Sequence, residues 1–219
     1  MIIDEKNCLI VLAAGHSKRM GHPKGLLKYN EANFWLEQQI KSFASLGGRS
    51  VVIVLGDDLT KYCEEIPWLQ GCRTGFCSSP VANNVVVKVI HNRSVEKGQF
   101  HSIILAAQFL NKHTPMIDRA MILPVDVPLA SSEAIKQLLS GLGDYGAVPR
   151  YRDSGGHPVI LTSNGIKTLL AESDSGKYDR LDHWLFDKVQ VKKVKTVKVR
   201  DELIIKNLNY MENWQTFIK

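Results

Sequence analysis

Residues 8–27 read CLIVLAAGHSKRMGHPKGLL, an apolar run followed by a loop that contains glycine and several cations. The short, uninterrupted run Cys8–Leu12 is typical of a buried parallel strand. The loop after it carries Gly15, Arg19 and Lys24 at the carboxyl end of that strand, where open α/β sheets bind their ligands. Glycine lets backbone N–H groups approach a phosphate, the Arg19 guanidinium can donate two hydrogen bonds to it, and Lys24 supplies a mobile charge. The pattern matches neither a Walker loop nor a dinucleotide fingerprint, and it predicts a triphosphate-binding loop rather than an exposed basic loop.

Strand-like and helix-like segments alternate along the rest of the chain, which predicts an α/β protein with a mainly parallel sheet. Late strands follow one another without intervening helices, so we expect some antiparallel pairing there. Residues 68–84 are rich in Gly, Ser, Pro and Asn and predict an irregular surface segment. We expect a single domain over residues 1–219. The predicted strands are 8–12, 51–55, 85–90, 119–123, 147–149, 158–161 and 188–200, and the predicted helices are 34–46, 59–66, 102–110, 131–139, 163–170, 178–186 and 211–217.

The composition is that of an ordinary globular protein, with 44% apolar and 23% charged residues in a chain of 219. No apolar run approaches the roughly 20 residues of a membrane-spanning helix. The first residues, MIIDEK, do not resemble a signal peptide, so we expect a cytoplasmic protein with no membrane partner. The four cysteines (Cys8, Cys63, Cys72 and Cys77) have no metal-binding spacing and are expected to be reduced.

The net charge of +6 comes largely from residues 188–200, which read KVQVKKVKTVKVR. Lysine alternating with valine indicates a strand with one apolar and one basic face. One interpretation is a sheet edge that lysine protects from pairing with other chains. Another is a basic rim that attracts an anionic substrate. Nucleic-acid binding is not expected, because no aromatic residues interleave with the basic face and no nucleic-acid motif is present.

Two further positions suggest a ligand site without settling it. Asp126 lies just beyond the predicted strand 119–123, at the same sheet edge as the loop, and on spacing alone it is a turn residue or a metal ligand. Ser102 follows Gly98 at the predicted start of a helix, whose free N–H groups suit polar or anionic ligands. Ser102 is also a candidate for the N-cap of that helix.

The stretch Leu12–Leu27 resembles the L-A-[AG]-G-x-S-x-R-M-G-x-x-K-x-L-L signature of the MobA-like nucleotidyltransferases, and further matches follow in order along nearly the whole chain. That family includes enzymes that attach CMP or GMP to molybdopterin. The resemblance implies a three-layer α/β/α Rossmann-like fold of the nucleotide-diphospho-sugar transferase type, with a mainly parallel mixed sheet. It also implies that the loop surrounds an NTP, with Arg19 and Lys24 on the phosphates. The other nucleotide-binding residues implied in the loop are Leu12, Ala13, Ala14 and Gly15.

The resemblance also assigns a metal site. Family members carry D-x-P where this chain has Asp126-Val127-Pro128, and that aspartate binds Mg²⁺ between triphosphate oxygens. Near the C-terminus, NLNYMEN stands where the family often has D-I-[DN]-T-P-E-[DE], which implies Asn207 as a second, neutral metal ligand. The alternative is that Asn207 ends a strand and Asn209 caps the last helix.

Two other matches imply contacts with the base and with the acceptor. The segment GQFHS resembles the family's G-x-x-x-S segment, in which the serine, here Ser102, contacts the base. The turn Gly155-Gly156-His157-Pro158 resembles the G-H-P turn of the cytidylyltransferase branch, which lies beside the acceptor pocket. Gly156 and His157 are therefore the expected acceptor-binding residues.

Taken with the family, these residues predict a magnesium-dependent nucleotidyltransferase in which Arg19, Lys24 and Asp126 are catalytic. The Ala-Ala-Gly sequence of the loop is similar to the cytidylyltransferase version, so we expect CTP as donor and molybdopterin as acceptor. One alternative is transfer to a sugar or alcohol phosphate. Another is a nucleotide-binding relative without turnover, because the C-terminal metal motif differs from the family's. The sequence predicts no oligomeric state.

Overall fold

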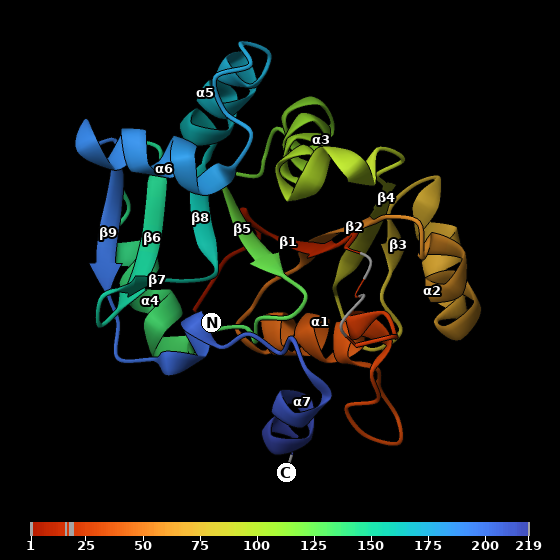
Figure 1. Ribbon diagram of the computed structural model, residues 1–219. Coiled ribbons are helices and arrows are strands. Elements are labelled where there is room, and N and C mark those ends of the chain that lie inside the picture. Colours follow the sequence, from red (N-terminus) through yellow and green to blue (C-terminus); the bar gives the residue numbers. More distant parts are fainter. Residues whose placement is uncertain (1, 16, 18–19, 219) are drawn as a thin grey trace.

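The apolar run at residues 8–12 becomes the central strand of a nine-stranded sheet in a computed structural model, which describes residues 2–15, 17 and 20–218 (Figure 1). β1 (Asn7–Ala13) is buried along its whole length. It pairs in parallel with β2 (Ser50–Leu55) on one side and with β5 (Arg119–Pro124) on the other. A strand covered on both faces needs apolar residues at every position, which explains why this run does not alternate.

The rest of the sheet is mixed, and its parallel ladders are the longer ones. β8 runs antiparallel to both β5 and β6, as expected for the late strands. The strand order is β3-β4-β2-β1-β5-β8-β6-β7, with β9 paired to β6. The remaining strands are β3 (Cys77–Ser78), β4 (Val86–His91), β6 (Gly146–Tyr151), β7 (Ser154–Gly155), β8 (Val159–Thr162) and β9 (Val194–Lys198).

Helices cover both faces of the sheet, which confirms the expected three-layer α/β/α fold (Figure 1). α3, α5 and α6 lie on one face, and α1 and α4 on the other, with α7 beyond α1. The α-helices are α1 (Trp35–Ser45), α2 (Leu59–Glu65), α3 (Gly98–His113), α4 (Ser132–Ser140), α5 (Ser163–Ser173), α6 (Leu181–Gln190) and α7 (Met211–Phe217). The 3-10 helices are η1 (Lys24–Leu26), η2 (Pro67–Arg73), η3 (Val95–Lys97) and η4 (Glu202–Ile205).

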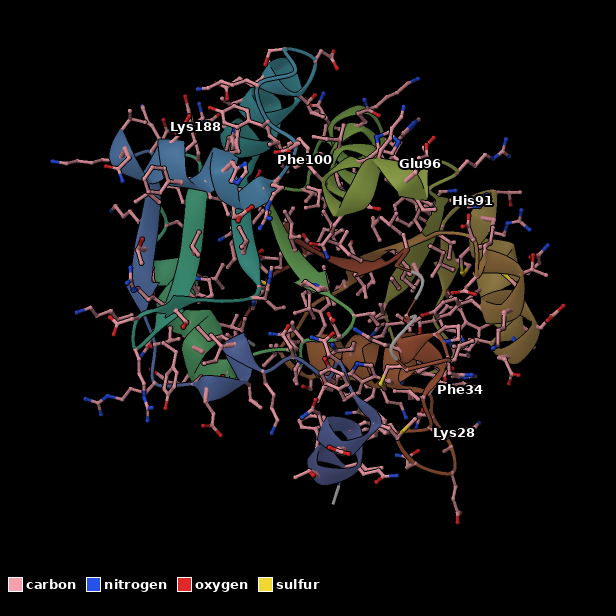
Figure 2. All side chains as sticks on the ribbon, in the orientation of Figure 1. Lys28, Phe34, His91, Glu96, Phe100 and Lys188 are labelled. Atoms are coloured by element: carbon pink, nitrogen blue, oxygen red, sulfur yellow. A yellow bond between two sulfur atoms is a disulfide. The ribbon has the colours of Figure 1, made fainter. Side chains whose placement is uncertain are left out.

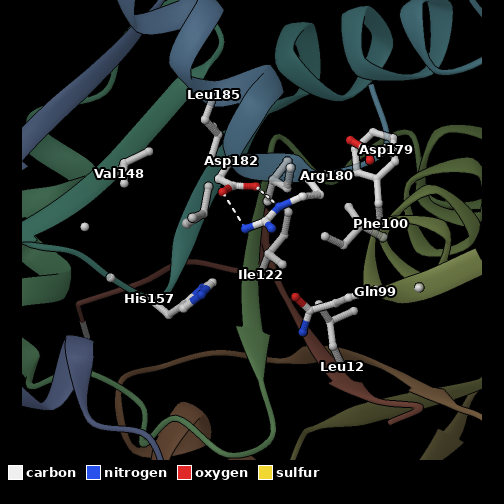
Figure 3. A pocket seen from close by; sticks show the side chains of 16 residues that line it. Leu12, Gln99, Phe100, Ile122, Val148, His157, Asp179, Arg180, Asp182 and Leu185 are labelled. Atoms are coloured by element: carbon white, nitrogen blue, oxygen red, sulfur yellow. Dashed lines mark hydrogen bonds and ion pairs between the residues drawn. The ribbon is translucent and has the colours of Figure 1, made fainter. Parts of the chain in front are cut away.

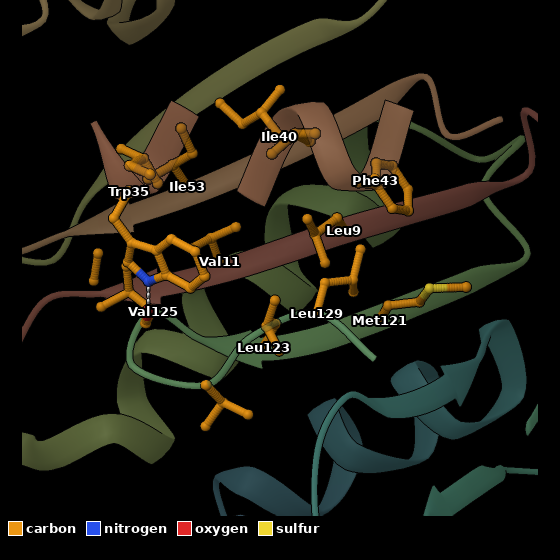
Figure 4. Packing of buried hydrophobic residues seen from close by; sticks show 14 of the residues in the cluster. Leu9, Val11, Trp35, Ile40, Phe43, Ile53, Met121, Leu123, Val125 and Leu129 are labelled. Carbon is orange, nitrogen blue, oxygen red and sulfur yellow. Dashed lines mark hydrogen bonds between the residues drawn. The ribbon is translucent and has the colours of Figure 1, made fainter. Parts of the chain in front are cut away.

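Alternate side chains of β1 enter two separate hydrophobic cores. Leu9 and Val11 pack with Ile40 and Phe43 of α1 (Figure 4), while Leu12 belongs to the core under α3 and α6. Successive strand residues point to opposite faces, so one apolar run serves both layers. Burying each such side chain stabilises the fold by about 1.5–3 kcal/mol.

The segment at residues 68–84 is more ordered than its composition predicts. It contains part of η2 and the short strand β3, which pairs antiparallel with β4. Leu69 and Cys72 are fully buried, because their three-residue spacing places both on one side of a 3-10 helix. Cys72 and Cys77 form a disulfide, so the expectation that all four cysteines are reduced is wrong for this pair.

The Lys/Val segment is only partly a strand. α6 continues to Gln190, where we expected the strand to have begun, and β9 covers only Val194–Lys198. The helix persists because Val189 packs against the second core and Lys188 donates to Glu172 Oε1 at 2.6 Å. β9 pairs on one side with β6, and its lysines are exposed, which agrees with an edge strand protected by charge. Among the described residues, no helix has the length and apolar character needed to cross a bilayer.

Candidate functional site

Three polar side chains that are far apart in the sequence meet beyond the carboxyl ends of β1 and β5. The Lys24 ammonium donates to Asp126 Oδ2 and to Asn209 Oδ1, at 2.6 Å in each case. The Lys24 and Asp126 side chains are only 14% and 21% exposed, so water screens this ion pair less than it would a surface pair. We call Lys24, Asp126 and Asn209 the polar cluster.

The backbone around Lys24 is held from both sides. The Gly25 N–H donates to the hydroxyl of Tyr62 on α2 at 3.2 Å. A Cβ atom at position 25 would lie 2.6 Å from that hydroxyl, so the close approach requires glycine. Downstream, Lys28 and Phe34 form a short antiparallel bridge, and the Lys28 ammonium lies 3.7 Å from the centre of the Phe34 ring (Figure 2).

Asp126 follows β5 directly, and the main chain on either side of it is hydrogen-bonded. The Val125 N–H donates to the Leu12 carbonyl at 3.0 Å, which extends the β1–β5 ladder past the end of β5. The Asp126 carbonyl accepts from the Leu208 N–H at 2.8 Å. This second bond brings the C-terminal segment, and with it Asn209, to the edge of the sheet.

The structure places Asn209 in the polar cluster and leaves Asn207 outside it. Asn207 is exposed, and its amide donates to the Ile205 carbonyl at 3.2 Å. In an extended segment, residues two apart point the same way but are about 7 Å apart, so only one of them reaches Lys24. Asn209 does not cap α7 either, since Tyr210 holds the N-cap position.

A small cavity of about 170 Å³ lies beside the start of the loop. Its lining includes four of the predicted nucleotide-binding residues, namely Leu12, Ala14, Gly15 and Ser102. Ala13 points instead into the core on the other face of the sheet. Arg19 lies outside the described residues.

Ser102 lies inside α3 rather than at its start, because the helix already begins at Gly98. It is buried, and its hydroxyl accepts from the Asn92 amide at 2.9 Å. Asn92 also lines the small cavity, and sequence reasoning missed it. The available signal was an asparagine two residues after the predicted strand 85–90, at the sheet edge that carries the loop.

A larger cleft of about 570 Å³ adjoins the small cavity and shares Leu12, Gly98 and Gln99 with it (Figure 3). Gly156 and His157 line this cleft, as does the Arg180–Asp182 ion pair at 2.8 Å. Most other lining side chains are apolar, namely Leu12, Phe100, Ile103, Ile122, Val148, Val159, Leu181 and Leu185.

Close packing fixes the turn at residues 156–157. The His157 N–H donates to the Ile204 carbonyl at 2.8 Å, and a Cβ atom at Gly156 would clash with that same carbonyl. Burial lowers the pKa of the His157 imidazole, although the Ile122 carbonyl and the Asp126 charge oppose the shift. His157 Nδ1 is buried and has no hydrogen-bond partner among the described residues.

The lowered pKa predicts that His157 makes stability depend on pH. The unfolded chain, with a histidine pKa of about 6.5, takes up the proton more readily than the folded protein does. The contribution of the neutral, buried His157 ring to the free energy of unfolding is complete above about pH 6.5 and is lost as the pH falls below that value. We expect the unfolding free energy of His157→Gln, measured with denaturant, to fall less between about pH 7.5 and 5.5 than that of the wild type. Equal pH dependences in the two proteins would contradict this, and the exposed His183→Gln is the control.

The polar cluster supplies two oxygen atoms of the kind that bind magnesium. Asp126 Oδ2 and Asn209 Oδ1 already converge on one cation, the Lys24 ammonium. Hard oxygen ligands of this kind suit Mg²⁺, which needs only one or two protein ligands when phosphates supply others. Among the described residues there is no group of three or more acidic, histidine or cysteine side chains that would hold a metal without such help.

Comparison with solved structures shows a shared fold. Rv0371c from Mycobacterium tuberculosis H37Rv is 17% identical, with 99% of this chain and 98% of that chain covered and a TM-score of 0.68, and it has also been solved in complex with manganese. The nucleotidyl transferase Mth528 from Methanothermobacter thermautotrophicus is 16% identical, with 96% and 95% covered and a TM-score of 0.69. The 4-diphosphocytidyl-2C-methyl-D-erythritol synthase from Anaerococcus prevotii DSM 20548 is 12% identical, with 98% and 94% covered and a TM-score of 0.65.

Among curated proteins no match was found. The family model described as the MobA-like NTP transferase domain matches residues 9–189, which is most of the chain and includes the loop, Asp126 and His157. The match confirms the resemblance seen in the loop and identifies the chain as a nucleotidyltransferase. This chain therefore belongs to the MobA-like NTP transferase family.

Proposed function

We propose that this protein transfers CMP from CTP to the phosphate of molybdopterin, with Mg²⁺ as cofactor and pyrophosphate as the released product. The observation that carries the proposal is the polar cluster at the sheet edge beside two adjoining cavities. Leu12 connects these parts, because it lines both cavities and its carbonyl accepts from the residue before Asp126.

In this proposal the small cavity takes the base and sugar of the nucleotide. Its backbone groups at Ala14 and Gly15 can contact a base directly, because neither side chain covers them. The Ser102 hydroxyl accepts from Asn92, which leaves its own hydrogen to donate to a base carbonyl. The triphosphate then extends along the loop toward Lys24, with Arg19 as a further proposed phosphate ligand.

The larger cleft takes the acceptor. Its apolar side chains can pack against the flat heterocycle of molybdopterin, and Gln99, Arg180 and Asp182 can bond to the polar groups of the acceptor. His157 and Gly156 line the cleft, and the negative charge of Asp126 is close enough to act on the pKa of the His157 imidazole. The acceptor phosphate would therefore lie at the His157 side, near the polar cluster.

The proposed reaction is an in-line displacement. An oxygen of the acceptor phosphate forms a bond to the α-phosphorus of CTP, the bond from that phosphorus to the bridging oxygen breaks, and pyrophosphate leaves with both electrons of that bond. Little proton transfer is needed, so alignment and charge neutralisation carry the rate. Lys24 and Arg19 neutralise the triphosphate, and Asp126 with Asn209 would hold the cation. Bound magnesium would withdraw charge from the phosphate oxygens.

The test is magnesium-dependent pyrophosphate release with each of the four NTPs and a panel of phosphorylated acceptors. We expect release with CTP and molybdopterin, and none when the metal is chelated. Release with a sugar or alcohol phosphate instead would retain the transferase and change the acceptor. Nucleotide binding without release under any condition would support a non-catalytic relative.

We also predict a preference for pyrimidine nucleotides. Ala14 lines the small cavity at the position where the guanylyl branch more often has glycine, and in this proposal its methyl group takes space that a purine would need. One methyl group in a close-fitting pocket is worth about 1–3 kcal/mol, so CTP should bind roughly tenfold or more tightly than GTP. Calorimetric titration measures this, and Ala14→Gly should narrow the difference. Tighter binding of GTP by the wild type would refute the assignment.

A further inference from the structure

Trp35, the first residue of α1, contacts all three segments that supply the polar cluster. Its N–H donates to the Leu27 carbonyl at 2.8 Å, at the end of the segment that carries Lys24. Its indole Nε1 donates to the Val125 carbonyl at 2.6 Å, immediately before Asp126 (Figure 4). Its ring packs edge-on against Trp214 and Phe217 of α7, at 5.4 Å between ring centres in both cases. α7 follows Asn209, so one buried residue joins the three segments, with its backbone N–H on the first and its side chain on the other two.

Gln39, one turn further along α1, holds the other side of Asp126. Its amide donates to the Val127 carbonyl at 2.6 Å, and its carbonyl accepts from the Leu129 N–H at 3.1 Å. The Asp126 carbonyl itself is held by Leu208. Three consecutive carbonyls are therefore fixed, and two of the three donors are side chains of α1.

The Trp35 and Gln39 side chains have no hydrogen-bond partners elsewhere in the described part of the chain. Trp35 is 3% and Gln39 is 1% exposed, and the hydrogen bonds that their side chains make to the described residues all end on residues 125–129. A buried amide costs stability unless its donors and acceptors are matched. An apolar pair such as leucine and phenylalanine would fill the same space without orienting the loop.

We propose that Trp35 and Gln39 are positioning residues that hold the Asp126 carboxylate at the place where it meets Lys24 and Asn209. Turning any of the three fixed peptide groups would move the Asp126 side chain. A misplacement of about 1 Å at a reacting centre can lower a rate by roughly a hundredfold. The catalytic part of this inference rests on the proposed function, whereas the structural part does not.

The test uses two matched pairs of variants. Trp35→Phe keeps the ring against α7 and removes the indole donor. Trp184→Phe makes the same change at another buried tryptophan, whose Nε1 donates to Glu172 at 2.8 Å in the other core. Gln39→Met keeps the volume and removes both bonds. Gln38→Met is its control, because the Gln38 amide donates to Ser42 on the same helix and not to the Asp126 loop.

Two measurements distinguish positioning from general support of the fold. In pyrophosphate release, Trp35→Phe and Gln39→Met should lower kcat about tenfold or more and raise the magnesium concentration for half-maximal rate, with melting temperatures no lower than those of the controls. In amide hydrogen exchange, both variants should speed exchange at Leu208, the donor to Asp126, by about tenfold relative to Trp184→Phe and Gln38→Met.

Equal effects of the variants and their controls on both measurements would overturn the proposal. If the wild type releases no pyrophosphate with any nucleotide, the proposed function fails, and exchange at Leu208 still decides whether α1 holds the Asp126 loop. If Trp35→Phe does not fold, the Gln39 and Gln38 pair decides the question alone.

Discussion

Asp126→Asn is expected to lower kcat for pyrophosphate release by roughly a hundredfold or more while leaving the fold intact, because each 1.4 kcal/mol of lost transition-state stabilisation is about tenfold in rate. The substitution keeps the size of the side chain and the main-chain bond to Leu208. It removes the only formal negative charge of the polar cluster. Asn209 would remain as a neutral ligand, and two neutral oxygens hold Mg²⁺ poorly.

The competing interpretation is that Asp126 only shapes the turn after β5. That interpretation predicts a lower melting temperature with near-normal activity per folded molecule. Both quantities should be measured on the same sample, with Asp118→Asn as the control, since Asp118 lies just before the other end of β5 and pairs with Lys6 at 3.2 Å. A destabilised but fully active Asp126→Asn protein would refute the metal assignment.

Lys24→Met should lower kcat/KM for the nucleotide by about tenfold or more, because a charge-assisted bond to a phosphate is worth roughly 1.5–3 kcal/mol. Methionine retains the apolar stem of lysine and loses the ammonium. The variant also leaves the Asp126 carboxylate without its partner at 2.6 Å in a largely buried position, so some loss of stability should accompany it. Steady-state kinetics with varied nucleotide and fixed acceptor measures the first effect, and thermal unfolding measures the second.

Lys28→Met is the matched control, since Lys28 lies four residues further on, is exposed and does not reach the cluster. A double variant with Asp126→Asn tests whether the pair acts as a unit. If it does, the combined loss in kcat/KM should be smaller than the product of the single losses. An unchanged kcat/KM for Lys24→Met would end the proposed phosphate role.

Much of the fold follows from the sequence because buried strands and amphipathic helices leave strong local patterns. The run at residues 8–12 and the helical spacing within 34–46 were sufficient to predict β1 and α1. The prediction of a strand over 188–200 is wrong at its start, because alternating lysine and valine also fit the end of a helix. The packing of Val189 and the bond from Lys188 to Glu172 favour the helix there. Such contacts join residues that no local pattern connects.

The site was predictable only in part for the same reason. Lys24 and Asp126 stand in a recognisable loop and at a strand end, and the structure brings them together. The choice of Asn209 over Asn207 depends on where Leu208 meets Asp126, a pairing between residues 82 positions apart in the sequence. Trp35 and Gln39 carry no motif at all, since tryptophan and glutamine on a helix are ordinary until the structure shows what they bond to.

The two cavities are lined mainly by different stretches of the chain, so mutations in one stretch can change one cavity and leave the other intact. The small cavity is built entirely from residues 12–102, whereas the far wall of the cleft comes from residues 148–185, on β6, the β8 turn and the start of α6. The two contributions are consecutive along the chain, and the two cavities share Leu12, Gly98 and Gln99. Exchanges or insertions in the later stretch can therefore alter which molecule is modified without disturbing recognition of the donor. Proteins with this fold can therefore keep the same nucleotide-binding residues while the acceptor-binding residues change.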